Sequence, residues 1–152
     1  MTDVLAPCPG RVLALEEVPD EVFSSAMLGP GLALDPLPEQ TTVSAPISGT
    51  VVKIHPHAFA IQGIDGVGIL VHLGIDTVTL GGTGFEVLAA DGDTVAVGDP
   101  MIRWDPSAIT GEEISAVIPI VALEQPAEAV RQRAEPASSV SAGDSLFTVN
   151  AS

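Results

Sequence analysis

Short apolar runs alternate with turns that contain proline or glycine along the whole chain of 152 residues. The runs are rich in Val, Ile, Thr and Leu, which is typical of many short β-strands joined by turns. One helix is predicted over residues 106–114, with Asp105 as its N-cap and Pro106 as its first residue, and a shorter helical turn begins at Asp20. Residues 124–139 are polar and rich in Ala and Pro, and we expect them to form a surface segment before the last strand. The predicted strands cover residues 4–6, 10–16, 31–35, 42–45, 49–55, 58–62, 67–73, 94–95, 100–104, 116–121 and 146–149.

A histidine interrupts the apolar strand predicted over residues 67–73. The sequence alternates strictly here, so Gly68, Leu70 and His72 point to one face and the branched aliphatic side chains point to the other. A neutral hydrophobe would pack better than His72 in such a run. The shallow face that His72 shares with a glycine would let a partner molecule approach.

The other two histidines lie upstream of a turn signal at residues 63–66. Two adjacent strands that fold back on each other at this turn would bring His57 and His72 together. Paired imidazoles suit phosphoryl transfer through a histidine or the binding of a transition metal. His55 could be a third metal ligand, a phosphate contact or an ordinary exposed residue, and the last interpretation is favoured.

The sequence contains an internal repeat. Residues 6–15 match residues 45–54 in the frame Ala-Pro-x-x-Gly-x-Val, and residues 95–102 match residues 140–147 around a Gly-Asp pair. Each copy is too small to bury its own apolar face, so two copies must pack together to form one core. The repeat therefore predicts an all-β sandwich or barrel with approximate internal symmetry.

Composition and charge limit the classes of function. A chain of this length with 46% hydrophobic residues fits a single globular domain, residues 1–152. With 20 acidic and 5 basic residues the net charge is −15, which repels phosphate backbones and makes nucleic acid an unsuitable partner. A protein partner with a basic contact face is expected, although solubility alone could explain the charge.

Cysteine usage and the N-terminus bear on the cellular location. Cys8 is the only cysteine, so an internal disulfide is excluded, and its apolar surroundings favour a structural role over a nucleophilic one. The chain has no export signal and no apolar run long enough to cross a membrane, which predicts a soluble, cytoplasmic protein. The initial Met suggests a protein that stands alone.

Two alternatives to phosphoryl transfer follow from the residues. His55-x-His57 and His72-x-x-x-Asp76 have the spacing of metal ligands, so a zinc-dependent hydrolase on a related duplicated β scaffold is the main alternative. A biotinyl or lipoyl carrier would need a lysine at the tip of a hairpin, whereas Lys53 lies within a predicted strand. The chain also lacks the glycine-rich loop with lysine of nucleotide hydrolases and the Gly-x-Ser-x-Gly motif of serine hydrolases.

Two motifs carry a resemblance to a known family. Residues 45–54 followed by His57-Ala-Phe, and the run Leu70-Val-His-Leu-Gly-Ile-Asp-Thr-Val78, resemble the glucose-type enzyme IIA domain of the bacterial sugar phosphotransferase system. The resemblance implies an all-β sandwich with a duplicated hairpin motif and no cofactor or resident metal. It implies that the phosphocarrier protein HPr donates a phosphoryl group, which passes to a cysteine on a sugar-specific IIB domain during sugar uptake. Regulatory target proteins are a further class of partner in some relatives.

The resemblance also assigns residues. His72 matches the histidine that accepts the phosphoryl group, and His57 matches the supporting histidine. The partner-binding surface would include Asp76, which faces the basic carrier, together with an apolar rim and a flexible glycine: Val22, Phe23, Leu70 and Gly74. This chain departs from the family because it lacks the threonine that usually stands just before the supporting histidine, and His55 is the residue that could replace it.

Overall fold

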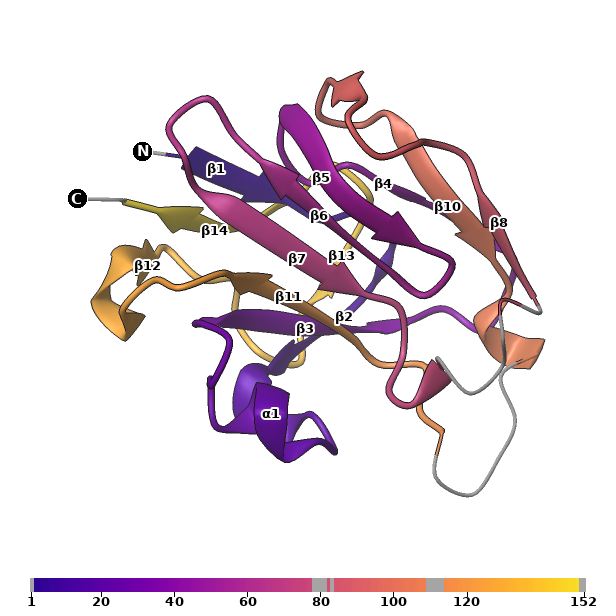
Figure 1. Ribbon diagram of the computed structural model, residues 1–152. Coiled ribbons are helices and arrows are strands. Elements are labelled where there is room, and N and C mark those ends of the chain that lie inside the picture. Colours follow the sequence, from indigo (N-terminus) through magenta and orange to yellow (C-terminus); the bar gives the residue numbers. More distant parts are fainter. Residues whose placement is uncertain (1, 78–81, 83, 109–113, 151–152) are drawn as a thin grey trace.

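The computed structural model describes residues 2–77, 82, 84–108 and 114–150, and it is built almost entirely from short strands (Figure 1). Each strand predicted from the sequence overlaps an observed strand, with shifts of a few residues at the ends. Single turns of 3₁₀ helix occur at Leu15–Glu17, Pro106–Ala108 and Ala127–Ala129, and one short helix, α1, spans Glu21–Ser24. The strands are β1 (Thr2–Leu5), β2 (Gly10–Ala14), β3 (Gly31–Pro36), β4 (Thr41–Ser44), β5 (Gly49–His55), β6 (Ala58–Gln62), β7 (Gly68–His72), β8 (Phe85–Val87), β9 (Thr94–Val95), β10 (Pro100–Trp104), β11 (Ile118–Ala122), β12 (Val130–Arg131), β13 (Ser139–Val140) and β14 (Ser145–Val149).

The strands form three antiparallel sheets. The largest has the order β13-β2-β3-β11-β7-β6-β5-β9, and the two small sheets have the orders β1-β14-β12 and β4-β10-β8. The small sheets lie toward opposite sides of the view in Figure 1, with the strands of the large sheet between them. The apolar core draws on all three sheets, and its bulkiest members are Phe59, Trp104 and Phe147. This architecture confirms the predicted all-β sandwich.

The internal repeat of the sequence is a repeat of the structure. The two Ala-Pro frames cross each other: the N–H of Leu5 donates to the carbonyl of Pro46 at 3.0 Å, and the N–H of Ser44 donates to the carbonyl of Pro7 at 2.8 Å. The strand order of the large sheet is symmetric about its centre. Counted inward from the two edges, β13, β2, β3 and β11 of one half correspond to β9, β5, β6 and β7 of the other.

The second repeated motif holds the first in place. Each Gly-Asp turn forms a pair of backbone hydrogen bonds, 2.7–2.9 Å long, with the alanine of one Ala-Pro frame. Gly143 and Asp144 bond Ala6 in one half, and Gly98 and Asp99 bond Ala45 in the other. An aspartate side chain in each turn accepts a further backbone N–H at 2.8 Å, which fixes the tight turn that the sequence predicts.

The helix predicted over residues 106–114 is wrong as far as the structure describes it. Only one 3₁₀ turn, Pro106–Ala108, forms, with Asp105 accepting the N–H of Ser107 at 3.0 Å, and residues 109–113 lie outside the described part. The helical turn predicted after Asp20 is confirmed as α1, in which the N–H of Val22 donates to the carboxylate of the N-cap residue Asp20 at 2.8 Å.

Residues 124–139 are more than a surface segment, which corrects the prediction. Ala129 and Val130 are buried in the core, and β12 pairs with β14. The end of the segment enters β13, which pairs with β2. The strand β8 was also missed.

A second apolar cluster lies under α1. Phe23 of α1 packs with side chains from β2, β3 and β11 and from the loop after β7, and it is only 7% exposed. The other buried members are Leu13, Leu15, Val18, Ala33, Ile75 and Val121. This cluster fixes the short helix at the end of β7. None of the helices in the described ranges is long and apolar enough to span a membrane.

Candidate functional site

The hairpin of β6 and β7 brings two histidines to one end of the large sheet. His72 ends β7 and pairs with Ala58, the first residue of β6. His57 directly precedes β6, in the tight turn after β5, and its carbonyl accepts the backbone N–H of Leu73 at 2.7 Å. The two imidazole centroids lie 5.3 Å apart, with their planes at 71°.

Two further rings complete a row of four. The ring of His55, which is exposed, stacks on His57 with a centroid distance of 5.7 Å and an interplanar angle of 18°. At the other end of the row, the ring of Phe23 lies 5.2 Å from that of His72 at 55°. His57 and His72 are half-buried between these neighbours.

A carbonyl group fixes the tautomer of His72. The Nδ1 atom lies 2.5 Å from the carbonyl oxygen of Gly74. Because a carbonyl oxygen can only accept, Nδ1 must carry the proton, and Nε2 of the neutral ring keeps a free lone pair. The turn that holds this carbonyl is secured by the hydroxyl of Thr77, which donates to the carbonyl of Leu73 at 2.6 Å, and by mutual backbone bonds between Ile75 and Ser115.

Both central histidines are shifted toward the neutral form. Burial lowers the pKa of His72 below its ordinary value, although the hydrogen bond to Gly74 and the carboxylates of Asp20 and Asp76 act against this shift. Burial also lowers the pKa of His57, and the neighbouring charges of His72 and His55 lower it further. A neutral imidazole has the lone pair that a nucleophile requires.

Of the residues expected at the rim of the site, Phe23 and Gly74 adjoin the imidazole of His72, and both are buried. Leu70 shares the face of β7 with His72 and is half-buried, Val22 is 40% exposed on α1, and Asp76 is exposed just beyond the Gly74 turn. The sequence identifies Asp20 only as the start of a helical turn, but its carboxylate also acts electrostatically on His72. The place of Asp20 just before a short helix does not indicate this effect.

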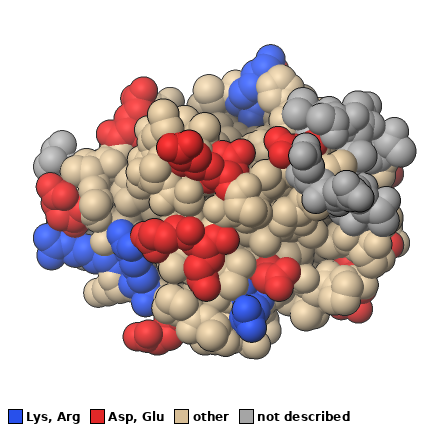
Figure 2. Space-filling model, turned by 90° about the horizontal axis from the view of Figure 1, so that it is seen from below, with Lys and Arg blue, Asp and Glu red and all other residues tan. Residues whose placement is uncertain are grey.

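The surface around α1 is acidic. Figure 2 views the face on which α1 lies, with acidic groups gathered over its middle and basic groups toward its edges. Among the residues that the structure describes, Lys53 forms an ion pair with Asp91 at 3.1 Å and Arg103 forms one with Glu86 at 2.6 Å. A partner that approaches this face would therefore meet mainly negative charge.

The ligand-like spacings of the sequence do not produce a metal cluster within the described ranges. There, no group of three or more His, Cys, Asp or Glu side chains is arranged to hold a metal ion.

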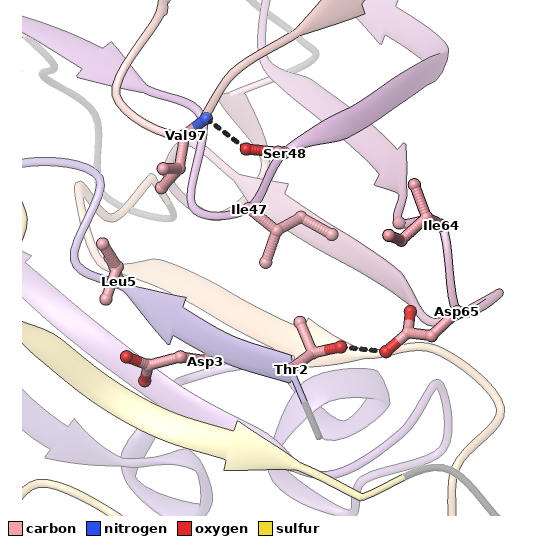
Figure 3. Close-up of a pocket in the computed structure, with 9 residues that line it drawn as sticks. Thr2, Asp3, Leu5, Ile47, Ser48, Ile64, Asp65 and Val97 are labelled. Atoms are coloured by element: carbon pink, nitrogen blue, oxygen red, sulfur yellow. Dashed lines mark hydrogen bonds between the residues drawn. The ribbon is translucent and has the colours of Figure 1, made fainter.

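A separate cavity of about 500 Å³ lies at the far end of β6 and β7. Its lining includes Thr2, Leu5, Ile47, Ile64 and Asp65, and a hydrogen bond between Thr2 and Asp65 spans one end of it (Figure 3). None of the three histidines lines this cavity.

Comparisons with known proteins agree on one family. The family model described as "phosphoenolpyruvate-dependent sugar phosphotransferase system, EIIA 1" matches residues 2–128. A glucose-specific EIIA component of the phosphotransferase system from Staphylococcus aureus is 39% identical over 120 residues, which are 78% of this chain and 71% of that protein. A glucose-specific EIIBCA component from Corynebacterium glutamicum is 38% identical over 123 residues, 80% of this chain but 18% of that longer protein. Among solved structures, the glucose permease IIA from Mycoplasma capricolum matches with a TM-score of 0.86 and 37% identity, covering 95% of this chain and 93% of its own.

Proposed function

The chain belongs to the EIIA 1 family of the phosphoenolpyruvate-dependent sugar phosphotransferase system and is a phosphoryl carrier of that system, and we propose that His72 is the residue that carries the phosphoryl group. Membership of this family leaves the zinc-dependent hydrolase without support. The single observation that carries the proposal is the hydrogen bond of 2.5 Å from Nδ1 of His72 to the carbonyl of Gly74, because it leaves Nε2 free to react.

The transfer proceeds by exchange of one P–N bond for another. The lone pair of Nε2 attacks phosphorus, the P–N bond of the donor phosphohistidine breaks, and its electron pair returns to the donor imidazole. In the next step, a cysteine thiolate of the acceptor attacks phosphorus, and the electron pair of the P–Nε2 bond returns to His72. Nδ1 keeps its proton and its hydrogen bond to the Gly74 carbonyl throughout, so the ring needs no change of tautomer.

His57 has the role of a supporting group. Its ring centroid lies 5.3 Å from that of His72, and in its neutral form it retains one N–H to offer to a phosphoryl oxygen. The loose transition state of phosphoryl transfer depends mainly on positioning and charge neutralisation. Because Asp20 and Asp76 are the charged neighbours of His72, the neutralising cations must come largely from the partner protein.

We propose HPr as the donor and a sugar-specific IIB domain as the acceptor. The acidic carboxylates of Asp20 and Asp76 would attract a partner with a basic face and raise the rate of encounter. The apolar side chains of Val22 and Leu70, backed by the buried Phe23, would supply the dry centre of the contact. Gly74 is itself buried and would act by holding the carbonyl that orients His72. The relative from Corynebacterium glutamicum is named an EIIBCA component, which supports a partnership with IIB. Contacts with regulatory target proteins and a location in the cytoplasm stay predictions.

Phosphorylation in a reconstituted system tests the assignment. The protein is incubated with phosphoenolpyruvate, enzyme I and HPr, and its intact mass is measured before and after acid treatment. The wild type should gain one acid-labile phosphoryl group. His72→Ala should gain none while keeping a wild-type circular dichroism spectrum. His57→Gln should still be phosphorylated but should donate to IIB more slowly.

Thr50→Ala, on an exposed position of β5, serves as the matched control and should behave as the wild type. Normal labelling of the His72 variant would refute the acceptor assignment, and an unaltered donation rate in the His57 variant would remove its supporting role.

A further inference from the structure

His55 stands at the outer end of the row of rings because of how the β5–β6 hairpin turns. It is the last residue of β5 and pairs with Ala58, so only Pro56 and His57 form the turn. The pyrrolidine ring of Pro56 fixes its own φ and stiffens this two-residue connection. The backbone therefore holds His55 next to His57, and their rings stack at 5.7 Å and 18°.

The ring of His57 is bounded on two sides. His55 stacks against it from the solvent side, and His72 meets it at 71° from the sheet side. His57 occupies a turn and not a strand, so its side chain lacks the cross-strand neighbours that normally restrict a rotamer. Without the outer ring, the imidazole of His57 would gain freedom to rotate away from His72.

We propose that His55 is a positioning residue for phosphoryl transfer, whose ring holds the imidazole of His57 in the orientation that meets His72. This proposal rests on the proposed function of His72 and His57 and adds a third residue to it. His55 need not touch the phosphoryl group, because it acts through His57.

The charged groups around the four rings determine how a substitution of His55 would change the pKa of His57. His55 and His72 both lower the pKa of His57, and burial lowers it as well. His55 also faces the carboxylate of Asp91, which accepts the N–H of Ile54 at 2.8 Å and pairs with Lys53. On the other side, Asp20 and Asp76 act on His72. Removal of the His55 imidazole should therefore raise the pKa of His57.

Two substitutions separate the ring from its charge. His55→Ala removes the stacked ring, whereas His55→Phe keeps an aromatic surface and removes the imidazole nitrogens. The interaction free energy of an aromatic pair corresponds to a change in rate of about threefold to tenfold when the pair is lost. We therefore expect His55→Ala to slow donation to IIB by about threefold to tenfold, and His55→Phe to stay within about twofold of the wild type. Thr50→Ala on the same strand is the control and should leave the rate unchanged.

A double variant tests whether His55 acts through His57. In His55→Ala/His57→Gln, donation should be no slower than in His57→Gln alone, because the group that His55 positions is already gone. In parallel, the pKa of each histidine is measured by nuclear magnetic resonance on the unphosphorylated protein. The pKa of His57 should rise in both His55 variants, while that of His72 should change less.

Several outcomes would overturn the proposal. It fails if His55→Ala donates at the wild-type rate, if His55→Phe is as slow as His55→Ala, or if the effects of the two single variants multiply in the double variant. An unchanged pKa of His57 would also contradict it. Failure of the proposed function looks different: the wild type itself would then gain no phosphoryl group on His72, and the role of His55 would fall with it.

Discussion

Replacement of Gly74 by alanine should damage the site and the fold together. The carbonyl of Gly74 accepts the Nδ1 proton of His72, and its backbone has φ = +83°, in the left-handed region. A Cβ atom added there would lie 2.5 Å from Cγ2 of Thr77 and 2.6 Å from the carbonyl oxygen of Ser115. Both contacts are far shorter than real Cβ contacts, so the turn must shift.

The expected cost has two parts. A non-glycine residue in the left-handed region costs about 1–2 kcal/mol. Overpacking against Thr77 and the backbone of Ser115 costs a further ~1–3 kcal/mol. Together they amount to about 2–5 kcal/mol, a large share of the ~5–15 kcal/mol that stabilises a typical domain.

Gly66→Ala provides a matched control. Gly66 has nearly the same φ, +86°, but no atom lies within 4 Å of an added Cβ. This variant measures the backbone cost alone, so the difference between the two alanine variants measures the crowding around Gly74. Urea unfolding can be followed through the fluorescence of Trp104, the only tryptophan, which is buried and 1% exposed.

The loss of stability should accompany a loss of activity in one variant only. Gly74→Ala should accept phosphoryl groups slowly even at temperatures where it is folded, because the carbonyl that orients His72 has moved. Gly66→Ala should accept them at the wild-type rate. Equal losses of stability in the two variants would refute the crowding argument, and an unchanged rate in Gly74→Ala would refute the orienting role of the carbonyl.

Two further predictions concern titration and thiol chemistry. Because the pKa values of His57 and His72 are lowered from 6.5 in the folded protein, the unfolded chain binds protons first as the pH falls. The free energy of unfolding should therefore decline as the pH falls below about 6.5, and urea titrations between pH 8 and pH 5 should show a smaller decline for His72→Gln; equal declines would contradict the assignment. Burial raises the pKa of the Cys8 thiol to about 12, so a thiol reagent at pH 8 should react only at the rate of unfolding, and fast labelling of the native protein would contradict the burial.

Simple alternation in the sequence determines on which face of β7 His72 lies. Val67, Ile69, Val71 and Leu73 are all fully buried, which fixes the register of β7 and directs His72 to the opposite face. A shift by one residue would bury the histidine and expose the aliphatic face, so no other register competes. The pairing of β6 with β7 is predicted separately, by the turn signal at residues 63–66 that joins the two strands.

The other contacts of His72 could not be predicted in this way. The helix α1 has only four residues, too few for a helical pattern to show which side chain faces the sheet. The approach of Phe23 and the electrostatic effect of Asp20 depend on how α1 packs against β2, β3 and β11. The tautomer of His72 depends on the path of the chain after β7, where Gly74 and Asp76 both have positive φ.

Two of the two-residue strands, β12 and β13, were missed for a related reason, although β9, which is equally short, was predicted. The strands β12 and β13 have two residues each, and such segments show no alternation. Both are edge strands, and their pairing is set by the partner strand. The match between residues 95–102 and 140–147 nevertheless contained the information for β13, because Val140 pairs with Gly10 as Val95 pairs with Gly49.

The site arises where the two halves of the repeat differ. In the second half, β5 turns back at once through Pro56 and His57 into β6. In the first half, β2 leads into the 3₁₀ turn at Leu15–Glu17 and a longer connection that contains α1 before the chain enters β3. This connection places Phe23 against His72, which belongs to the other half. Because one half supplies the histidines and the other supplies the ring and the Asp20 carboxylate beside them, neither copy of the repeat could form the site alone.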